Sequence, residues 1–446
     1  MQDPNSPYWD RERETMDPGI RDKASFEALK NQLARCYAEI PFYRRLWDKH
    51  GFDHTKVETF ADFTASCPVV TKKMLVADQA AYPPFGSYLG IDPSEIFRIH
   101  GSSGTSGTPT MYGVSREEWE QSREIYALTH WSIGVRPDDI VLFAFPFGLF
   151  FGGWGMLHAA ESVGAKLLPM GAATTQAHVE MIYKMGCTVI EGTPSYLIRL
   201  ADAARDLGYD PAKSPLKRAL LGGEPGGSIP ATKQRIIDEW GLISACDSGT
   251  SSEMFPFCTS TECTEMQGLH LYNDEIWTEI VEADDPYRAV PEGEVGHLVY
   301  THLHRRSQPM IRFAVGDRSY LTREPCPCGR TYPRLPQGLM GRVDDTLVIR
   351  GANVYPTNVE HVLRSFPEVG AEFRIQVSTR NHLDELLVQV EIADREMPES
   401  EKADLGKRLE SALTTHCLIR VPVELVPPDT LPRAALKARR VVDHRK

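Results

Sequence analysis

Between residues 140 and 245, short apolar runs alternate with helical stretches. The apolar runs cover residues 140–145, 165–168, 188–190, 219–221 and 242–245, and the helical stretches cover residues 177–185, 194–207 and 230–240. This alternation predicts βαβ units and a parallel sheet. Several runs lead into turns rich in Gly, Ser or Thr, and ligands of open α/β sheets bind beyond the carboxyl ends of the strands. We therefore expect the functional site along these turns.

The composition is that of an ordinary soluble globular protein and disfavours several function classes. Of the 446 residues, 41% are hydrophobic and 25% are charged, which argues against a disordered or fibrous chain. The 61 acidic residues outnumber the 49 Lys and Arg, and the formal net charge of −12 disfavours binding to nucleic acid or to an anionic membrane. No apolar run reaches the roughly 18 residues that span a bilayer. The first residues lack a basic region followed by an apolar stretch, so we expect a cytoplasmic protein.

A change in composition near residue 341 divides the chain. It follows a stretch rich in Pro and Cys at residues 325–336. Beyond it lie an alternating apolar run at 386–392 and a helical stretch at 399–415, which suit a small α+β unit. We therefore expect an α/β protein. Its large N-terminal domain, residues 1–340, should have mostly parallel sheets flanked by helices, and residues 341–446 should form a small, mobile α+β lid domain.

The loop Ser102-Ser-Gly-Thr-Ser-Gly-Thr-Pro-Thr110 carries the strongest functional signal. Its glycines permit unusual φ angles, and its hydroxyl and backbone N–H groups can surround a polyphosphate without bulky side chains in the way. The same composition also suits a Gly/Ser linker. The loop is not a Walker loop, because the pattern GxxxxGK[ST] is absent, so a P-loop NTPase is disfavoured.

This loop resembles the phosphate-binding loop of the adenylate-forming acyl-CoA synthetase superfamily. Its last residue, Thr110, stands where many members carry Lys and resembles the phenylacetate-CoA ligase branch. Motifs similar to those of the family follow in its order at residues 222–225, 249–253, 311–317, 341–345, 349–356 and 431–437. The resemblance covers nearly the whole chain. It implies an AMP-forming ligase that uses ATP to activate an aromatic carboxylic acid and then passes the acyl group to coenzyme A.

The implied reaction brings a carboxylate to the α-phosphorus of ATP, so two anions must meet. Such chemistry needs charge neutralisation and positioning more than a nucleophilic side chain. The resemblance implies that Glu253 helps to bind Mg²⁺, a hard ion that prefers oxygen ligands. It also implies that Asp317 binds the ribose hydroxyls and that Arg342 makes a second ribose or phosphate contact. The other implied ATP contacts are Ser102, Ser103, Gly104, Thr105, Ser106, Gly107, Thr108, Gly223, Glu224, Pro225, Asp247, Ser248, Gly249, Thr250 and Ser252.

The C-terminal segment at residues 431–437 resembles the family segment whose lysine bridges the substrate carboxylate and the α-phosphate. The resemblance therefore implies that Lys437 is catalytic, and a long flexible cation on a mobile domain suits this task. Leu436 departs from the family pattern, which usually has Gly at this place. The resemblance further implies that the lid rotates about Asp344 and that the loop around Gly351 forms the tunnel for the thiol.

The acid pocket is expected in the aromatic stretch from residue 141 to residue 153 and in the turn after residue 221. Phe143 lies within the predicted strand and is expected in the core. Aromatic residues at or beyond the strand end, interleaved with Gly and Pro, can line a flat cavity. By resemblance, the acid-binding residues are Phe145, Phe147, Phe150, Phe151, Gly152 and Gly222. A hydroxy-, amino- or unsubstituted benzoate and an arylacetate all remain open as substrates.

Three cysteines and one histidine make a candidate metal site, namely Cys263, His270, Cys326 and Cys328. Three thiolates and one imidazole are a closed tetrahedral ligand set for structural zinc. The spacing alone also fits scattered reduced thiols. The phenylacetate-CoA ligase branch often carries matching Cys and His residues, so the resemblance implies zinc that stabilises the nucleotide site. The other histidines have no carboxylate or cysteine partner at a meaningful spacing, among them His100, His130 and His158.

Alternative functions remain open at this point. One keeps the adenylation step but passes the acyl group to the phosphopantetheine arm of a carrier protein or to an amine, because the residues before Lys437 are altered. The other is a non-catalytic regulator that binds a nucleotide or zinc on the same scaffold. Assembly into a homodimer is also left open.

Overall fold

The predicted parallel strands form part of an eight-stranded sheet in the computed structural model, with the order β14-β10-β9-β8-β7-β6-β4-β5. The parallel strands are β4 (Ile140–Phe143), β5 (Lys166–Pro169), β6 (Val189–Gly192), β7 (Arg218–Leu221) and β8 (Ser244–Gly249). Antiparallel pairing adds β9 (Ser260–Thr261), β10 (Leu269–Leu271) and β14 (Arg334–Leu335). The structure describes the chain except for residues 1–2, 103–108, 150, 225, 343–346, 350–351, 381–382, 418, 434–439 and 446.

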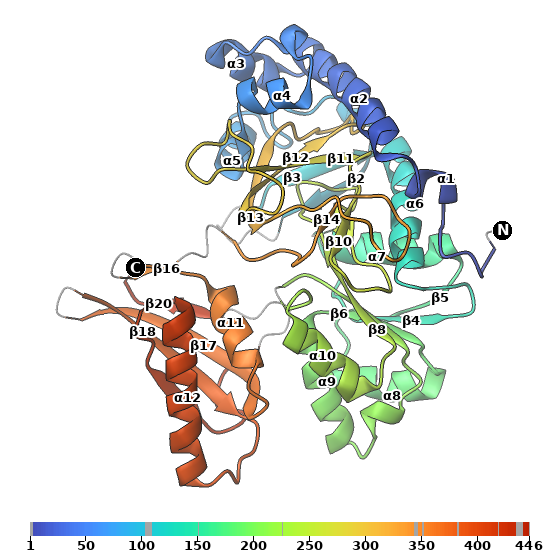
Figure 1. Cartoon of the computed structure of the whole chain (residues 1–446). Coiled ribbons are helices and arrows are strands. Elements are labelled where there is room, and N and C mark those ends of the chain that lie inside the picture. The colour runs from blue at the N-terminus through green and yellow to red at the C-terminus, as the bar shows by residue number, and fades with distance from the viewer. Residues whose placement is uncertain are drawn as a thin grey trace.

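Helices cover both faces of this sheet, as the predicted βαβ units require (Figure 1). Helices α6 (Arg116–Ser132) and α7 (Gly152–Val163) pack on the face that carries Val141 and Phe143. Residues of the opposite face, such as Leu142, pack against α8 (Thr175–Met185), α9 (Pro194–Asp206) and α10 (Pro230–Trp240). Neighbouring residues of a strand point to opposite faces of the sheet. Since helices cover both faces, a strand that is apolar throughout is buried on both sides.

A second sheet, of order β1-β13-β12-β11, packs against the N-terminal helices in a large hydrophobic core. Its strands are β1 (Val70–Thr71), β11 (Ile276–Val281), β12 (Gly296–His302) and β13 (Phe313–Ser319), and a separate hairpin pairs β2 (Ile96–Gly101) with β3 (Met111–Ser115). The helices are α1 (Arg11–Glu14), α2 (Pro18–Glu39), α3 (Pro41–His50), α4 (Phe60–Ser66) and α5 (Lys72–Ala81). Short 3₁₀ turns lie at His54–Lys56, Pro93–Glu95 and Pro211–Lys213. The N-terminal part therefore combines parallel and antiparallel strands.

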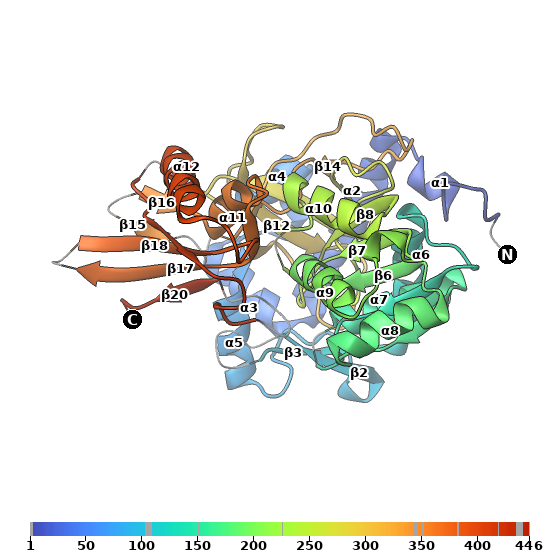
Figure 2. The ribbon, with the colours of Figure 1, turned by 90° about the horizontal axis from the view of Figure 1, so that it is seen from below.

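The C-terminal part forms a separate α+β unit, which projects to one side of the molecule in Figures 1 and 2. A four-stranded sheet has the order β19-β18-β17-β20, and β15 pairs with β16. The elements are β15 (Leu347–Ile349), β16 (Ala352–Val354), α11 (Pro356–Arg364), β17 (Val369–Arg380), β18 (Leu383–Ile392), α12 (Glu399–Cys417), β19 (Val423–Val426) and β20 (Val441–Asp443). This unit has its own hydrophobic core. It contacts the N-terminal part through α11 against α10 and β17 against α9.

No helix within the described ranges is long and apolar enough to cross a membrane.

A buried ion pair joins the second sheet to α4. The Arg312 side chain is fully buried and lies 3.3 Å from the carboxylate of Glu279 on β11. Its guanidinium also donates hydrogen bonds to the carbonyl oxygens of Thr64 (2.9 Å) and Cys67 (2.5 Å). Burial raises the pKa of the Glu279 carboxyl, while Arg312 opposes that shift. The pair therefore fixes the end of α4 against the sheet.

We predict that Glu279→Leu destabilises the fold by about 3 to 5 kcal/mol, because it leaves the Arg312 charge buried without its carboxylate. The free energy of unfolding from urea titration measures this effect. The matched control is Glu282→Leu, since Glu282 pairs with Arg288 at 3.4 Å on the surface. We expect that control to change stability by no more than about 0.5 kcal/mol. Equal losses in the two variants would contradict the prediction.

Candidate active site

Glu253, Lys72 and Thr110 come together from three separate segments. Lys72, the first residue of α5, donates from Nζ to Thr110 Oγ1 at 2.7 Å and to the carboxylate of Glu253. The Tyr112 hydroxyl lies 2.6 Å from Thr110 Oγ1 and donates to Glu253 Oε1 at 3.3 Å. Burial raises the pKa of Tyr112 well above its ordinary value, so the phenol is neutral. The candidate Mg²⁺ ligand thus lies beside a fixed ammonium group.

The ends of the phosphate-loop candidate are held together at this cluster. Thr110 N–H donates to Ser102 Oγ at 3.1 Å, and Ser102 N–H donates to the carbonyl oxygen of Thr110 at 3.0 Å. The residues predicted to hold the phosphates between these ends, 103–108, lie outside the described residues. The two ends of the loop, Ser102 and Thr110, therefore lie together at the cluster that contains Glu253.

The turns after β7 and β8 lie side by side because these strands are parallel neighbours, with Leu221 opposite Asp247. Ser248 Oγ donates to the carbonyl oxygen of Leu221 at 2.9 Å, and a Cβ added at Gly222 would lie 2.8 Å from Ser248 Oγ. Glu224 Oε1 accepts the N–H of Ser195 at the start of α9 at 2.8 Å. The expected nucleotide residues Gly223, Glu224, Asp247, Ser248 and Gly249 and the expected acid-binding residue Gly222 are thus neighbours, whereas Pro225 lies outside the described residues.

The loop after β8 carries the remaining residues of this motif. Thr250 Oγ1 donates to the carbonyl oxygen of Phe257 at 3.4 Å, and Ser252 is half-buried next to the buried Glu253. This loop leads from the end of the parallel strand to the Lys72 contact.

The two candidate ribose contacts also meet. Arg342 Nη1 lies 3.2 Å from Asp317 Oδ1, and the two backbones form an antiparallel bridge. Next to them, the Arg318 guanidinium lies 4.2 Å from the centre of the Tyr355 ring in the C-terminal part. Asp344, Gly351 and Lys437 lie outside the described residues.

The residues expected to line the acid pocket lie in different environments. Phe145 and Phe147 are half-buried beyond β4, and a Cβ added at Gly223 would lie 3.5 Å from Phe145 Cε1. Phe151 is buried instead in an aromatic cluster with His100, Trp119 and Phe255. Gly152 begins α7, and Phe150 lies outside the described residues. This arrangement favours Phe145 as a residue near the nucleotide turns.

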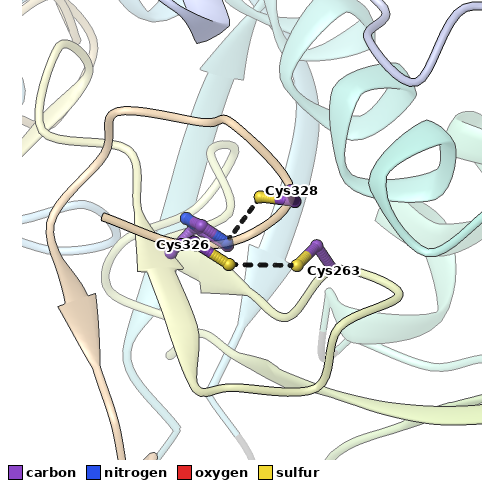
Figure 3. A group of neighbouring side chains, drawn as sticks. Cys263, Cys326 and Cys328 are labelled. Atoms are coloured by element: carbon purple, nitrogen blue, oxygen red, sulfur yellow. Dashed lines mark hydrogen bonds between the residues drawn. The ribbon is translucent and has the colours of Figure 1, made fainter. Parts of the chain in front are cut away.

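The cysteines and histidine of the candidate metal site converge, and Figure 3 shows the three cysteines. Cys263 Sγ lies 3.8 Å from Cys326 Sγ, and Cys328 Sγ lies 3.5 Å from His270 Nε2. All four ligand atoms lie within 4.8 Å of one another. A tetrahedral zinc with bonds of about 2.0 to 2.3 Å requires ligand atoms about 3.3 to 3.8 Å apart. The residues therefore fit such an ion in number and type, and the pairs Cys263–Cys326 and Cys328–His270 also fit it in spacing.

The electrostatics of the cluster favour a thiolate at one of its three cysteines. Hydrogen bonds from the thiols of Cys263 and Cys326 lower the pKa of Cys328, which favours its thiolate. Burial lowers the pKa of His270, so its imidazole is neutral, as a metal ligand must be. All nine cysteines are free rather than paired in disulfides.

Two contacts were not predicted from the sequence. Lys72 was missed, although the available signals were two adjacent lysines at 72 and 73 and the absence of Lys at position 110. The expectation that His130 has no carboxylate partner is wrong. His130 Nε2 lies 2.6 Å from Glu191 Oε1, and both side chains are fully buried. These residues lie 61 positions apart and meet because α6 packs on the face of β6.

Comparison with known proteins identifies the family. The model described as "AMP-binding enzyme" matches residues 27–302, and the model described as "AMP-binding enzyme C-terminal domain" matches residues 351–445. The chain belongs to the AMP-binding enzyme family. Phenylacetate-coenzyme A ligase of Thermus thermophilus is 35% identical over 436 residues, which cover 94% of this chain and 96% of that protein. The Escherichia coli enzyme of the same name is 30% identical over 425 residues, covering 94% of each chain.

These relatives confirm the resemblance deduced from the motifs. The chain is a member of the phenylacetate-CoA ligase-like branch and an AMP-forming acid–thiol ligase, with ATP and coenzyme A as its co-substrates. A 2-hydroxyisobutyryl-CoA ligase in its post-adenylation state, in complex with 2-HIB-AMP, matches the fold with a TM-score of 0.94 at 38% identity. That match covers 100% of this chain and 94% of the other.

The conformation of this chain resembles one state of that ligase more than another. The same ligase in its thioesterification state matches with a TM-score of only 0.74, although identity is 39% and coverage is 99% of this chain and 95% of the other. Since identity and coverage hardly change, the difference lies in how the parts of the chain are arranged. The arrangement of this AMP-binding enzyme is therefore more similar to the post-adenylation complex than to the thioesterification complex of that ligase.

Asp247 has an unusual protonation environment at the end of β8. Burial raises the pKa of its carboxyl to about 7, and the nearby Glu262 carboxylate adds to the shift. Ser228 Oγ donates to Asp247 Oδ2, and the N–H of Ser248 donates to Oδ1 at 2.9 Å, which opposes it. The group therefore changes charge near neutral pH.

We predict that Asp247→Asn flattens the pH dependence of stability. Between about pH 4, where an unfolded Asp titrates, and pH 7, the folded enzyme holds one proton more at this position than the unfolded chain. The free energy of unfolding of the wild type should thus fall as pH rises through this window, by on the order of 2 kcal/mol from pH 5 to pH 7.5 relative to the variant. Urea unfolding at both pH values measures the difference. Asp238→Asn, at an exposed residue of α10, should keep the wild-type slope, and the same slope in Asp247→Asn would contradict the prediction.

Proposed function

We propose that this ligase adenylates an aromatic carboxylic acid of the benzoate or arylacetate type and transfers the acyl group to coenzyme A. The observation that carries the proposal is the cluster of Lys72, Glu253 and Thr110 at the ends of a hydroxyl-rich loop. It joins a cation, a carboxylate and the loop at one point, as nucleotide activation requires. Phe145 beside Gly223 and the phenylacetate-CoA ligase relatives support the aromatic acid.

In the proposed adenylation step, the loop from Ser102 to Thr108 holds the phosphates that leave as pyrophosphate. Lys72 adds positive charge at the base of the loop, and Lys437 brings a second charge to the acid and the α-phosphate. Asp317 and Arg342 hold the ribose. Positive charge is then in place next to the carboxylate and the phosphates before they react. It lowers the free-energy barrier for the reaction between these two anions.

Glu253 would hold Mg²⁺, which supplies positive charge to the phosphates when bound. Among the described residues, the hydrogen bonds to the Glu253 carboxylate all fall on Oε1, from Lys72 and Tyr112. Its other oxygen therefore suits a hard cation.

The thioester step would use a different face of the C-terminal part from the face used in the adenylation step. We propose that residues 341–446 form the mobile domain, that it turns about Asp344, and that the loop around Gly351 guides the thiol of coenzyme A to the adenylate. The separate hydrophobic core of this part supports movement as one body.

A second candidate substrate is a small hydroxy acid. It is favoured by the 38% identity to the 2-hydroxyisobutyryl-CoA ligase over all of this chain, because the ligand of that structure is a non-aromatic adenylate.

Pyrophosphate exchange into ATP, driven by an acid, tests the proposed function. We expect exchange with benzoates or arylacetates to exceed exchange with 2-hydroxyisobutyrate, and we expect a thioester to form with free coenzyme A. Exchange with 2-hydroxyisobutyrate alone would support the second candidate. Exchange without a coenzyme A thioester would support a carrier-protein or amine acceptor. The absence of exchange with every acid would support a non-catalytic regulator.

We predict that Lys72→Met slows acid-dependent exchange by about 10²-fold or more, because it removes a charge aimed at the phosphates while keeping the side-chain length. The measurement is the exchange rate at saturating acid. Lys73→Met is the matched control, since Lys73 is the next residue and is exposed. Similar rates in the two variants would refute the role of Lys72.

We also propose that Cys263, His270, Cys326 and Cys328 bind one structural Zn²⁺. The ion would join the segment between β9 and β10 to the loop before β14. It would stabilise the fold rather than take part in the reaction. The mutual distances and the neutral imidazole support this assignment.

We predict about one equivalent of zinc in protein purified without added metal, and a clear loss of zinc in Cys326→Ser. Metal analysis by mass spectrometry measures both. Cys187→Ser, which changes a buried cysteine outside the cluster, should retain the metal. The site would be refuted if the wild-type protein contains no zinc and if added zinc leaves its thermal stability unchanged.

A further inference from the structure

Arg305 lies directly behind Glu253, with its side chain fully buried in the segment between β12 and β13. Its Nη1 donates to the carbonyl oxygen of Glu253 at 3.0 Å. Its Nη2 lies 3.5 Å from the carbonyl oxygen of Gly113 on β3, and its Nε donates to Ser307 Oγ at 3.3 Å. One guanidinium therefore contacts the backbone of both segments that form the phosphate end of the site.

The charge of Arg305 has no carboxylate beside it. In the part of the chain that the structure describes, no carboxylate oxygen lies within 4.0 Å of this guanidinium, whereas the equally buried Arg312 pairs with Glu279. Glu118 is the carboxylate that acts on Arg305 through space, and its Oε1 accepts the N–H groups of Arg306 and Ser307 at 2.8 and 2.7 Å. Burial lowers the pKa of Arg305, as expected for a charge removed from water. Such a charge is costly unless an anion compensates it.

The contacts of Arg305 connect the candidate ligands of Mg·ATP. Gly113 follows Tyr112 along β3, and Thr110 directly precedes this strand; the side chains of Thr110 and Tyr112 both contact the Lys72–Glu253 pair. The residue after Glu253 is also fixed, because its carbonyl oxygen lies 2.9 Å from His302 Nε2. Arg305 thus sets the separation between the base of the phosphate loop and the Glu253 backbone.

We propose that Arg305 is a positioning residue for Mg·ATP: by holding the backbone of Glu253 and of Gly113, it fixes the Glu253 carboxylate relative to Thr110. The inference rests on the proposed nucleotide role of this site. It assigns a function to a residue that does not itself touch the nucleotide. Because the Arg side chain donates in a fork, a lysine can preserve the charge but cannot reach all three acceptors.

Binding of Mg·ATP in the absence of acid tests this role by calorimetry, together with the Mg²⁺ dependence of exchange. Arg305→Gln should weaken Mg·ATP binding by at least about tenfold, because the Glu253 backbone loses a charge-assisted hydrogen bond that holds it in place, and should raise the Mg²⁺ concentration for half-maximal exchange. Arg305→Lys should fall between wild type and Arg305→Gln. Arg306→Gln is the matched control, because Arg306 is adjacent and exposed, and should bind like wild type.

The rate of thioester formation from coenzyme A and a synthetic acyl adenylate distinguishes a positioning role of Arg305 from a general loss of folding in the variant. This step does not use the triphosphate, so Arg305→Gln should retain it within about twofold while losing Mg·ATP affinity. Equal loss of both properties, or wild-type Mg·ATP affinity in Arg305→Gln, would overturn the proposal. A wild type that binds Mg·ATP but exchanges no pyrophosphate would instead overturn the proposed function and leave the binding test of Arg305 intact.

Discussion

The contact between Lys72 and Glu253 is the point on which the candidate site depends, because three separate β structures meet there. Lys72 follows β1 of the four-stranded sheet, Glu253 follows β8 of the eight-stranded sheet, and Thr110 precedes β3 of the hairpin. Joining two anions requires positive charge that is in place before reaction. The packing of the two sheets therefore sets the distance between cation, carboxylate and loop.

The C-terminal part is joined to this site differently. Its hydrophobic core is separate, and its contacts with the rest include the polar pairs Arg318–Tyr355 and Thr357–Met340, the second at 3.0 Å. Polar contacts of this kind can be broken and remade at lower cost than a shared apolar core. The fold matches the post-adenylation state of the 2-hydroxyisobutyryl-CoA ligase more closely than its thioesterification state.

Local patterns were sufficient for much of the fold. The apolar runs at 140–145 and 188–190 predicted β4 and β6, since a strand buried on both faces is apolar throughout. The residue types also indicated the candidate metal site, because three thiols and an imidazole are a recognisable ligand set. By contrast, the antiparallel sheet of β11, β12 and β13 was not predicted, and the residues around Lys72 in the sequence do not indicate its contact with Glu253.

The sequence by itself determined the order of the elements, the family and the chemical types of its candidate ligands, because these depend on local periodicity and on short motifs. Only the tertiary structure decided which charges meet. Lys72 reaches Glu253 across 181 positions, His130 meets Glu191 across 61, and Arg305 contacts both segments of the phosphate end. Such contacts follow from how sheets and helices pack against one another, and the energy of a buried charge depends on its neighbours in space rather than along the chain.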